Sequence, residues 1–166
     1  MRIHEKRRAI VPGSFDPITV GHEDLIRRAL KMFDEVYVVA MVNPEKHYRF
    51  SPEEKLRLMK AACRDLPHVI CDYDEGLLVA YAASHGIGTI VKGARTEADF
   101  LYEKRMAEIN RSMAPEIETV ILPAKEELSH ISSTAVRRAM DEGRDFSILL
   151  SPPVSEELSR IKSPQK

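Results

Sequence analysis

The loop PGSFDPITVGH at residues 12–22 combines two glycines with a histidine. Gly13 allows a tight turn, and Gly21 removes the Cβ that would keep a phosphate away from a helix start. The free N–H groups and the positive dipole end of such a helix bind anions. The same dipole disfavours imidazolium, so we expect His22 to be a neutral donor to a phosphate oxygen. The loop is neither GxGxxG nor a P-loop, which would need Gly-Lys-Ser/Thr.

Apolar runs alternate with segments of helical periodicity along the chain. The apolar, β-branched runs predict strands at residues 8–11, 36–42, 69–71, 89–91 and 119–122. A capping box with proline at the first helical position predicts that a helix starts at Pro52. The other helices are predicted at residues 22–33, 77–84, 97–113, 133–140 and 156–161.

This alternation predicts βαβ units and a parallel sheet with right-handed crossovers. Helices on both faces would make the fold α/β, a single doubly wound domain over residues 1–166. Such sheets bind ligands at the carboxyl ends of their strands. The loops at residues 12–21, 43–50, 92–95 and 123–133 are therefore the expected binding region, and Lys46, Lys92, Arg95 and Arg137 lie in or beside these loops.

Composition excludes several classes of protein. The 166 residues are 43% hydrophobic, which suits a globular domain, and the formal net charge is −1. That balance argues against a nucleic-acid partner, which would require a basic excess. The longest apolar run, residues 36–42, is too short for a membrane span, and we expect neither a membrane partner nor a signal peptide. Cys63 and Cys71 have no metal spacing, so we expect reduced thiols in the cytoplasm.

Two segments resemble the signatures of the nucleotidylyltransferase superfamily. Thr19-Val20-Gly21-His22 is similar to T/HxGH, and the ISSTAVR segment at residues 131–137 is similar to ISSTxxR. Residues 13–19, Lys46, residues 93–95, 99–103 and 110–111 together resemble the bacterial phosphopantetheine adenylyltransferase family, with similarity from about residue 8 to 158. That family transfers AMP from ATP to 4′-phosphopantetheine, giving dephospho-coenzyme A and pyrophosphate.

The resemblance implies a Rossmann-like nucleotidylyltransferase fold and a set of site residues. The implied catalytic residues are His22, Lys46 and Arg95. The implied acceptor-binding residues are Ser14, Lys46, Leu78 and Lys92. The implied ATP-binding residues are Ser14, Phe15, His22, Gly93, Ala94, Arg95, Glu103, Leu128, Ser129, His130, Ile131, Ser132, Ser133 and Thr134.

Four of these positions depart from the family's usual residues. Lys92 stands where arginine is common, which keeps the charge but loses the bidentate fork. Ser14 stands where threonine is common and keeps the hydroxyl. Leu128 replaces an aromatic residue, and His130 replaces what is often phenylalanine. None of the four removes a reacting group, so we expect them to affect affinity rather than the reaction.

The expected chemistry needs no general base, because a phosphate monoester with a second pKa of about 6 is already largely dianionic at pH 7. It needs positioning and neutralisation of two anions. We expect Mg²⁺ to be bound together with ATP, since no cluster of Asp and Glu in the sequence resembles a metal-binding site. The resemblance also implies a homohexamer inhibited by coenzyme A.

Two alternatives remain open. One is another member of the superfamily, such as a nicotinate-mononucleotide adenylyltransferase or a cytidylyltransferase, and the Gly-His loop does not exclude either. Lys46 and the segments at 93–95 and 100–103 favour the pantetheine acceptor. The other is a non-catalytic nucleotide-binding module, against which the joint presence of His22, Lys46 and Arg95 argues.

Overall fold

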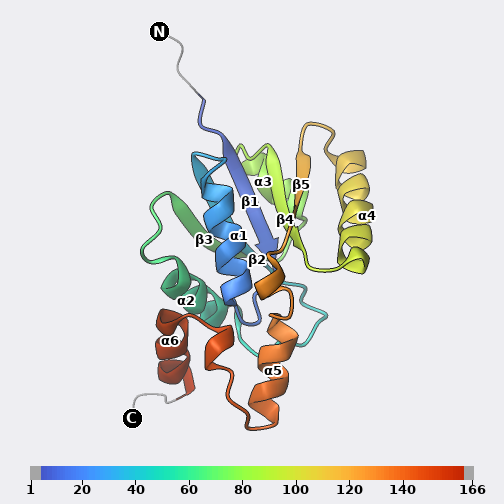
Figure 1. Ribbon diagram of the computed structural model, residues 1–166. Coiled ribbons are helices and arrows are strands. Elements are labelled where there is room, and N and C mark those ends of the chain that lie inside the picture. Colours follow the sequence, from blue (N-terminus) through green and yellow to red (C-terminus); the bar gives the residue numbers. More distant parts are fainter. Residues whose placement is uncertain (1–4, 163–166) are drawn as a thin grey trace.

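The centre of the fold is a five-stranded sheet of order β3-β2-β1-β4-β5, with every neighbouring pair parallel. The computed structural model describes residues 5–162, so both ends of the expected domain, residues 1–4 and 163–166, lie outside the described residues. The strands are β1 (Arg8–Gly13), β2 (Glu35–Met41), β3 (Val69–Asp74), β4 (Thr89–Ala94) and β5 (Glu118–Pro123). The expected parallel α/β sheet is confirmed (Figure 1).

Helices cover both faces of this sheet. The helices are α1 (Val20–Leu30), α2 (Pro52–Cys63), α3 (Leu78–Ser84), α4 (Glu97–Met113), α5 (Ser133–Asp141) and α6 (Pro152–Lys162), with short 3-10 turns η1 (Glu126–Leu128) and η2 (Ser147–Leu149). On one face Ile26 of α1 and Leu58 of α2 share a core with Val38. On the other, Val79 of α3 packs in a core with Ile10. Within residues 5–162 no helix is long and apolar enough to cross a membrane.

Some element boundaries differ from those that the sequence predicts. α1 begins at Val20 rather than His22, because Thr19 caps it, and it ends at Leu30 rather than Phe33. The chain leaves the helix there because Asp34 exchanges main-chain and side-chain hydrogen bonds with Arg7. α6 begins four residues earlier than expected, at Pro152, a residue suited to the first turn.

The predicted loop at residues 92–95 is wrong in its first three positions. Lys92, Gly93 and Ala94 belong to β4, where they pair in register with residues 121–123 of β5. Their side chains therefore have the alternating directions of a strand.

The order of the strands shows at which edge of the sheet a ligand is expected to bind. The chain runs outward from β1 to β3 and returns to β4 on the other side of β1, so the carboxyl ends of β1 and β4 flank the switch point. Figure 1 shows α5 beyond that edge of the sheet. The loop that follows β1 and the segment that precedes α5 meet there.

Candidate active site

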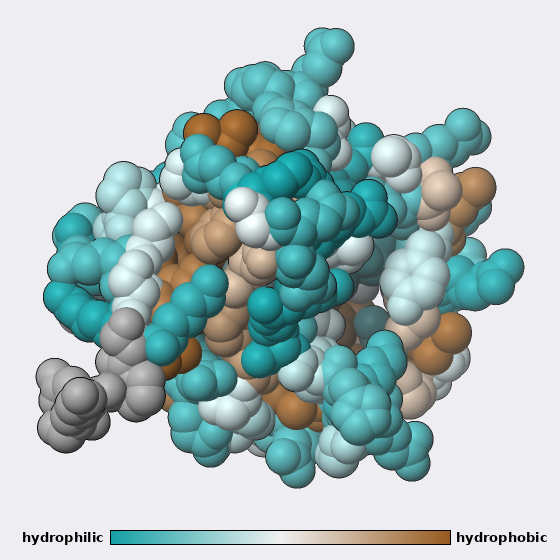
Figure 2. All heavy atoms as spheres, turned by 90° about the horizontal axis from the view of Figure 1, so that it is seen from below, coloured by the Kyte–Doolittle hydropathy of each residue, from teal (hydrophilic) through white to brown (hydrophobic). Residues whose placement is uncertain are grey.

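A cavity of about 320 Å³ opens at the carboxyl ends of β1 and β4. Viewed from this side, the surface is hollowed next to α4 (Figure 2). Two helix starts reach the cavity, that of α1 through Gly21 and that of α5 through Ser133. Main-chain N–H groups in the first turn of a helix lack intrahelical acceptors, so the two starts together suit an extended anion.

The orientation of His22 is fixed by the cap of α1. The main-chain N–H of Thr19 donates to Nδ1 of His22 at 3.0 Å, and the Thr19 hydroxyl accepts from the His22 main chain. This is a capping box with histidine in the place usually taken by Glu or Gln. Because Nδ1 is an acceptor, the neutral ring carries its proton on Nε2, which is left as a donor.

The imidazole of His22 is held neutral. Its pKa is lowered from 6.5 to about 4, chiefly by burial and also by the positive charges of Lys92 and Arg95. The lowered pKa agrees with the expected neutral state, and burial and two side chains contribute to it. A neutral donor next to two cations suits an oxygen that gains negative charge.

The ring of Phe15 packs against the ring of His22. The Phe15 ring is buried and lies edge-on to the His22 ring, with centroids 4.9 Å apart. Phe15 also takes the positive φ of the loop, 45°, so the tight turn expected at Gly13 lies two residues later. Gly13 is needed for another reason, because a Cβ there would lie 3.2 Å from the Phe15 ring.

Two cations at the end of β4, Lys92 within the strand and Arg95 directly after it, are paired with acids of α4. Nζ of Lys92 lies 3.3 Å from Oε1 of Glu103, and both side chains are largely buried. Nε of Arg95 lies 3.4 Å from Asp99, and its Nη1 donates to the carbonyl oxygen of Ile131 at 3.4 Å. These contacts hold both cations beside the cavity.

At the start of α5, two serine hydroxyls already have partners within the protein. Oγ of Ser132 caps the helix by accepting from the N–H of Ala135 at 3.0 Å. Oγ of Ser133 donates to the carbonyl oxygen of Pro17 at 2.7 Å. The donors that α5 still offers to a phosphate are therefore the main-chain N–H groups of its first turn and the O–H of Ser132, which acts only as an acceptor in the cap.

Most of the residues expected to bind ATP come together around this cavity. Those that line it are His22, Gly93, Arg95, Glu103, Leu128, Ile131, Ser132, Ser133 and Thr134, and the expected acceptor residue Lys92 lines it as well. The expected site residues that do not line it are Ser14, Phe15, Lys46, Leu78, Ala94, Ser129 and His130.

The expected acceptor residues lie in more than one place. Ser14 is exposed at the end of β1, and Lys46 is exposed in the loop after β2. Within residues 5–162, the Lys46 ammonium makes no ion pair. Leu78 is the first residue of α3, next to a second, shallower hollow lined by Met41 to Pro44 and by residues 75–77.

Several cavity residues were missed by the sequence reasoning. They are Val11 of β1, Asp24, Leu25 and Arg28 of α1, and Leu122 of β5. The helical period could have found Leu25, which lies three positions after His22 on the same face of α1. Arg28 is anchored across the sheet, because its Nη1 donates to the carbonyl oxygen of Pro123 at 2.9 Å.

The acids of the cavity are already neutralised by cations. Asp24 forms an ion pair with Lys125 at 2.8 Å, and Glu103 with Lys92. Among residues 5–162, no cluster of three or more His, Cys, Asp or Glu could hold a metal ion. A cation that acts here would take its ligands mainly from a bound triphosphate.

Comparison with known proteins agrees with this geometry. Residues 10–139 match the family model described as cytidylyltransferase-like. A phosphopantetheine adenylyltransferase of Thermotoga neapolitana is 43% identical over 150 residues, which cover 90% of this chain and 93% of the relative. Another, of Chloroflexus aggregans, is 42% identical over 160 residues, which cover 96% and 99%. The chain therefore belongs to the phosphopantetheine adenylyltransferase family.

Proposed function

We propose that this protein transfers AMP from ATP to 4′-phosphopantetheine, giving dephospho-coenzyme A and pyrophosphate. The observation that carries the proposal is the cavity where two helix starts, neutral His22 and the cations Lys92 and Arg95 face one another. Such a set binds and neutralises phosphates.

The proposed step is a direct in-line displacement. An oxygen of the acceptor phosphate forms a bond to the α-phosphorus of ATP. The bond from that phosphorus to the bridging oxygen breaks, and its electron pair leaves with pyrophosphate. Nε2–H of His22 donates to an oxygen of the α-phosphate as charge builds on it, and Arg95 and Lys46 neutralise the two anions.

We assign the nucleotide to the main cavity. Glu103 and the segment 128–134 border it, and the main chain of Gly93 allows close approach to β4. We assign the acceptor phosphate to Ser14, Lys46 and Lys92, and its arm to the hollow beside Leu78. The Lys92–Glu103 ion pair then lies where the two substrate sites adjoin.

Mg²⁺ fits this arrangement when it is carried by the triphosphate. It would supply positive charge that neutralises the pyrophosphate leaving group. The protein's own contribution is to hold the phosphate oxygens through the main-chain N–H groups at the starts of α1 and α5. We also propose a cytoplasmic location, where ATP is supplied and the free thiols Cys63 and Cys71 remain reduced.

We further propose that the protein assembles as a homohexamer and is inhibited by coenzyme A. Support for assembly is the apolar surface of α4, where Phe100, Leu101, Ile109 and Met113 are each more than 40% exposed. Coenzyme A carries the same pantetheine arm as the product, so it would compete for the acceptor site. Sedimentation equilibrium and inhibition against varied 4′-phosphopantetheine test the two points.

The activity itself is tested by incubating the protein with Mg-ATP and one acceptor at a time, and measuring pyrophosphate. Release with 4′-phosphopantetheine, and not with nicotinate mononucleotide or phosphocholine, is expected. A parallel series with CTP tests the cytidylyl transfer suggested by the family model's description. Release only with CTP, or only with another acceptor, would contradict the proposal.

A further inference from the structure

Asp16 is a buried carboxylate, only 4% exposed, in the loop between β1 and α1. Its Oδ2 accepts the main-chain N–H of Arg49 at 2.9 Å, and its Oδ1 accepts that of Phe50 at 3.0 Å. Both donors end the loop that carries Lys46. The carboxylate of Asp16 therefore links two loops. One is the loop at residues 14–19 that precedes His22 (the His22 loop), and the other is the loop at residues 43–50 that carries Lys46 (the Lys46 loop).

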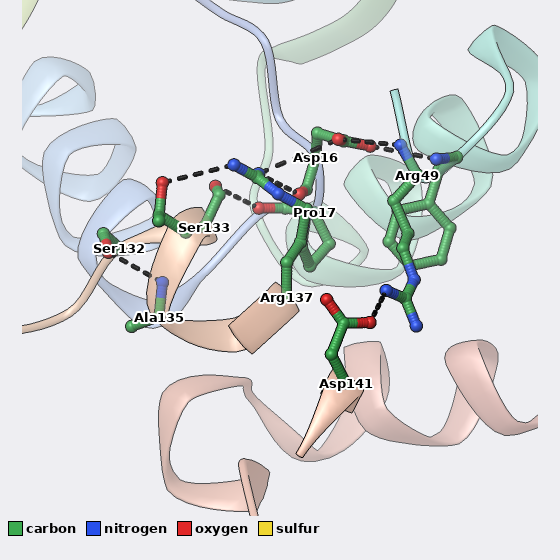
Figure 3. Close-up of polar contacts among 10 residues, drawn as sticks. Asp16, Pro17, Arg49, Ser132, Ser133, Ala135, Arg137 and Asp141 are labelled. Carbon is green, nitrogen blue, oxygen red and sulfur yellow. Dashed lines mark hydrogen bonds and ion pairs between the residues drawn. The ribbon is translucent and has the colours of Figure 1, made fainter. Parts of the chain in front are cut away.

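The same short segment is also tied to α5. Nη1 of Arg137 donates to the carbonyl oxygen of Asp16 at 2.7 Å and lies 3.7 Å from its Oδ2. Beside it, Ser133 donates to the carbonyl oxygen of Pro17. Figure 3 shows Asp16 and Pro17 between Arg49 on one side and Ser133 and Arg137 on the other. Three segments that are far apart in the sequence meet at these two residues.

A second cation lies near this junction. Lys55 is 1% exposed, and its Nζ has no hydrogen-bond partner among residues 5–162. That nitrogen lies 3.4 Å from the centroid of the Tyr48 ring. Burial lowers the pKa of Lys55, whereas the charge of Asp16 raises it. One carboxylate thus offsets two cations, Lys55 and Arg137. The residue at position 16 must therefore carry a negative charge, as well as accept the two main-chain hydrogen bonds.

Neither Asp16 nor Arg137 lines the cavity. The carboxylate of Asp16 is buried, and both of its oxygens are bonded within the protein, so it is not placed to contact a substrate. We infer that Asp16 is a positioning residue for adenylyl transfer. Its carboxylate fixes the Lys46 loop against the His22 loop and the start of α5, so that acceptor and nucleotide meet in one geometry. The inference rests on the proposed function and adds to it a residue that touches neither substrate.

Asp16→Asn tests this role with little change in volume. The amide oxygen can accept one main-chain N–H, but the second bond and the negative charge are lost. We expect kcat to fall about 100-fold, since misplacing a reacting group by about 1 Å costs that much. The KM for ATP should stay within about threefold, because the main cavity does not include Asp16.

A double-variant cycle separates positioning from general damage. If Asp16 acts through Lys46, Asp16→Asn combined with Lys46→Ala should be no slower than Lys46→Ala alone, within about threefold. Effects of two independent residues would multiply instead. Multiplication, or an Asp16→Asn variant with wild-type kcat, would overturn the inference.

Asp141→Asn is the matched control. It breaks the exposed ion pair between Asp141 and the Arg49 side chain, and it leaves both main-chain bonds to Asp16 in place. Its kcat should equal that of the wild type. A loss as large as that of Asp16→Asn would show that the Lys46 loop does not depend on the buried carboxylate in particular, and would contradict the inference.

Circular dichroism and thermal unfolding show whether Asp16→Asn folds. If it does not, Arg137→Gln removes the bonds to the same segment from the partly exposed α5. We expect Arg137→Gln to lower kcat and to cause no further loss when it is combined with Lys46→Ala. An Arg137→Gln variant with wild-type kcat, or one whose effect on kcat multiplies with that of Lys46→Ala, would overturn the inference. A wild-type protein that transfers AMP to none of the acceptors would instead contradict the proposed function.

Discussion

The N–H of Thr19 and Nδ1 of His22 are 3.0 Å apart, and this single contact fixes which ring nitrogen carries the proton. The residue that caps α1 therefore also directs the donor of the site. Local helix chemistry and the proposed catalysis depend on the same two residues.

Replacing His22 by alanine should lower kcat by about 10² to 10³, the usual loss for one preorganised donor. His22→Gln should recover part of the rate, since its amide N–H₂ can donate near the place of Nε2. Steady-state kinetics with circular dichroism measures both. His68→Asn, at the start of β3 away from the cavity, is the control. A folded His22→Ala variant with near wild-type kcat would reject the role.

The His22 ring should titrate near pH 4 in a ¹H NMR experiment. Because the folded pKa lies below the unfolded value of 6.5, the unfolded state binds a proton first. This group's contribution to the free energy of unfolding is complete above pH 6.5 and falls by about 3 kcal/mol as pH drops to 4. Lys92→Met should raise the pKa, since a nearby positive charge is removed. A wild-type pKa near 6.5 would contradict this picture.

Loss of Lys92 should affect the acceptor and spare ATP. A charge-assisted hydrogen bond to phosphate contributes roughly 1.5–3 kcal/mol, so Lys92→Ala should raise the KM for 4′-phosphopantetheine by about one to two powers of ten. Lys92→Arg should keep most activity, because the charge remains. Lys104→Ala, an exposed change on α4, controls for lost surface charge. A defect confined to ATP would remove Lys92 from the acceptor site.

Gly13→Ala should disturb His22 through Phe15. The added Cβ lies 3.2 Å from the Phe15 ring, which in turn lies against the His22 ring. We expect a loss of about 1–3 kcal/mol in the free energy of unfolding and a lower kcat. Urea denaturation and kinetics measure the two effects. Gly88→Ala, where a Cβ meets nothing within 4 Å, should change neither.

The two cysteines should be dispensable for turnover. Cys63 ends α2, Cys71 lies in β3, and neither lines the cavity. A hydrogen bond to Cys71 and burial both raise the pKa of the Cys63 thiol, so it is no nucleophile at neutral pH. A Cys63→Ala/Cys71→Ser variant should be less stable by about 1 kcal/mol and retain kcat. A folded but inactive double variant would contradict the mechanism.

The fold and the main cavity were readable from the sequence because their signals are local. Alternating periodicity predicted the parallel sheet, and a helix was predicted to start within each of the Thr19–His22 and 131–137 motifs, although α1 begins at Val20 rather than His22. The position of Arg28 at the cavity could not be predicted in this way, because its side chain is held by the carbonyl oxygen of Pro123, 95 residues away. The buried role of Asp16 was likewise hidden, because it depends on main-chain donors at Arg49 and Phe50.

The resemblance implies Ser132 and Ser133 as ATP-binding residues without indicating which of their atoms would bind. In the structure the Ser133 hydroxyl donates to Pro17, whereas the Ser132 hydroxyl accepts from Ala135 and keeps its own proton for another partner. Residue type showed that the groups belong to the site. Only the three-dimensional contacts show which of their atoms remain available to a ligand.

The contacts of Ser133 and Arg137 with the loop after β1 join residues 116 and 121 positions apart. During synthesis, the Asp16 loop leaves the ribosome long before either partner exists. The cavity at the carboxyl ends of β1 and β4 is consequently incomplete until α5 has been made, after the β1–β2–β3 half can already have paired. A chain truncated before α5 would retain the strands of the sheet and lack the second of the two helix starts that line the cavity.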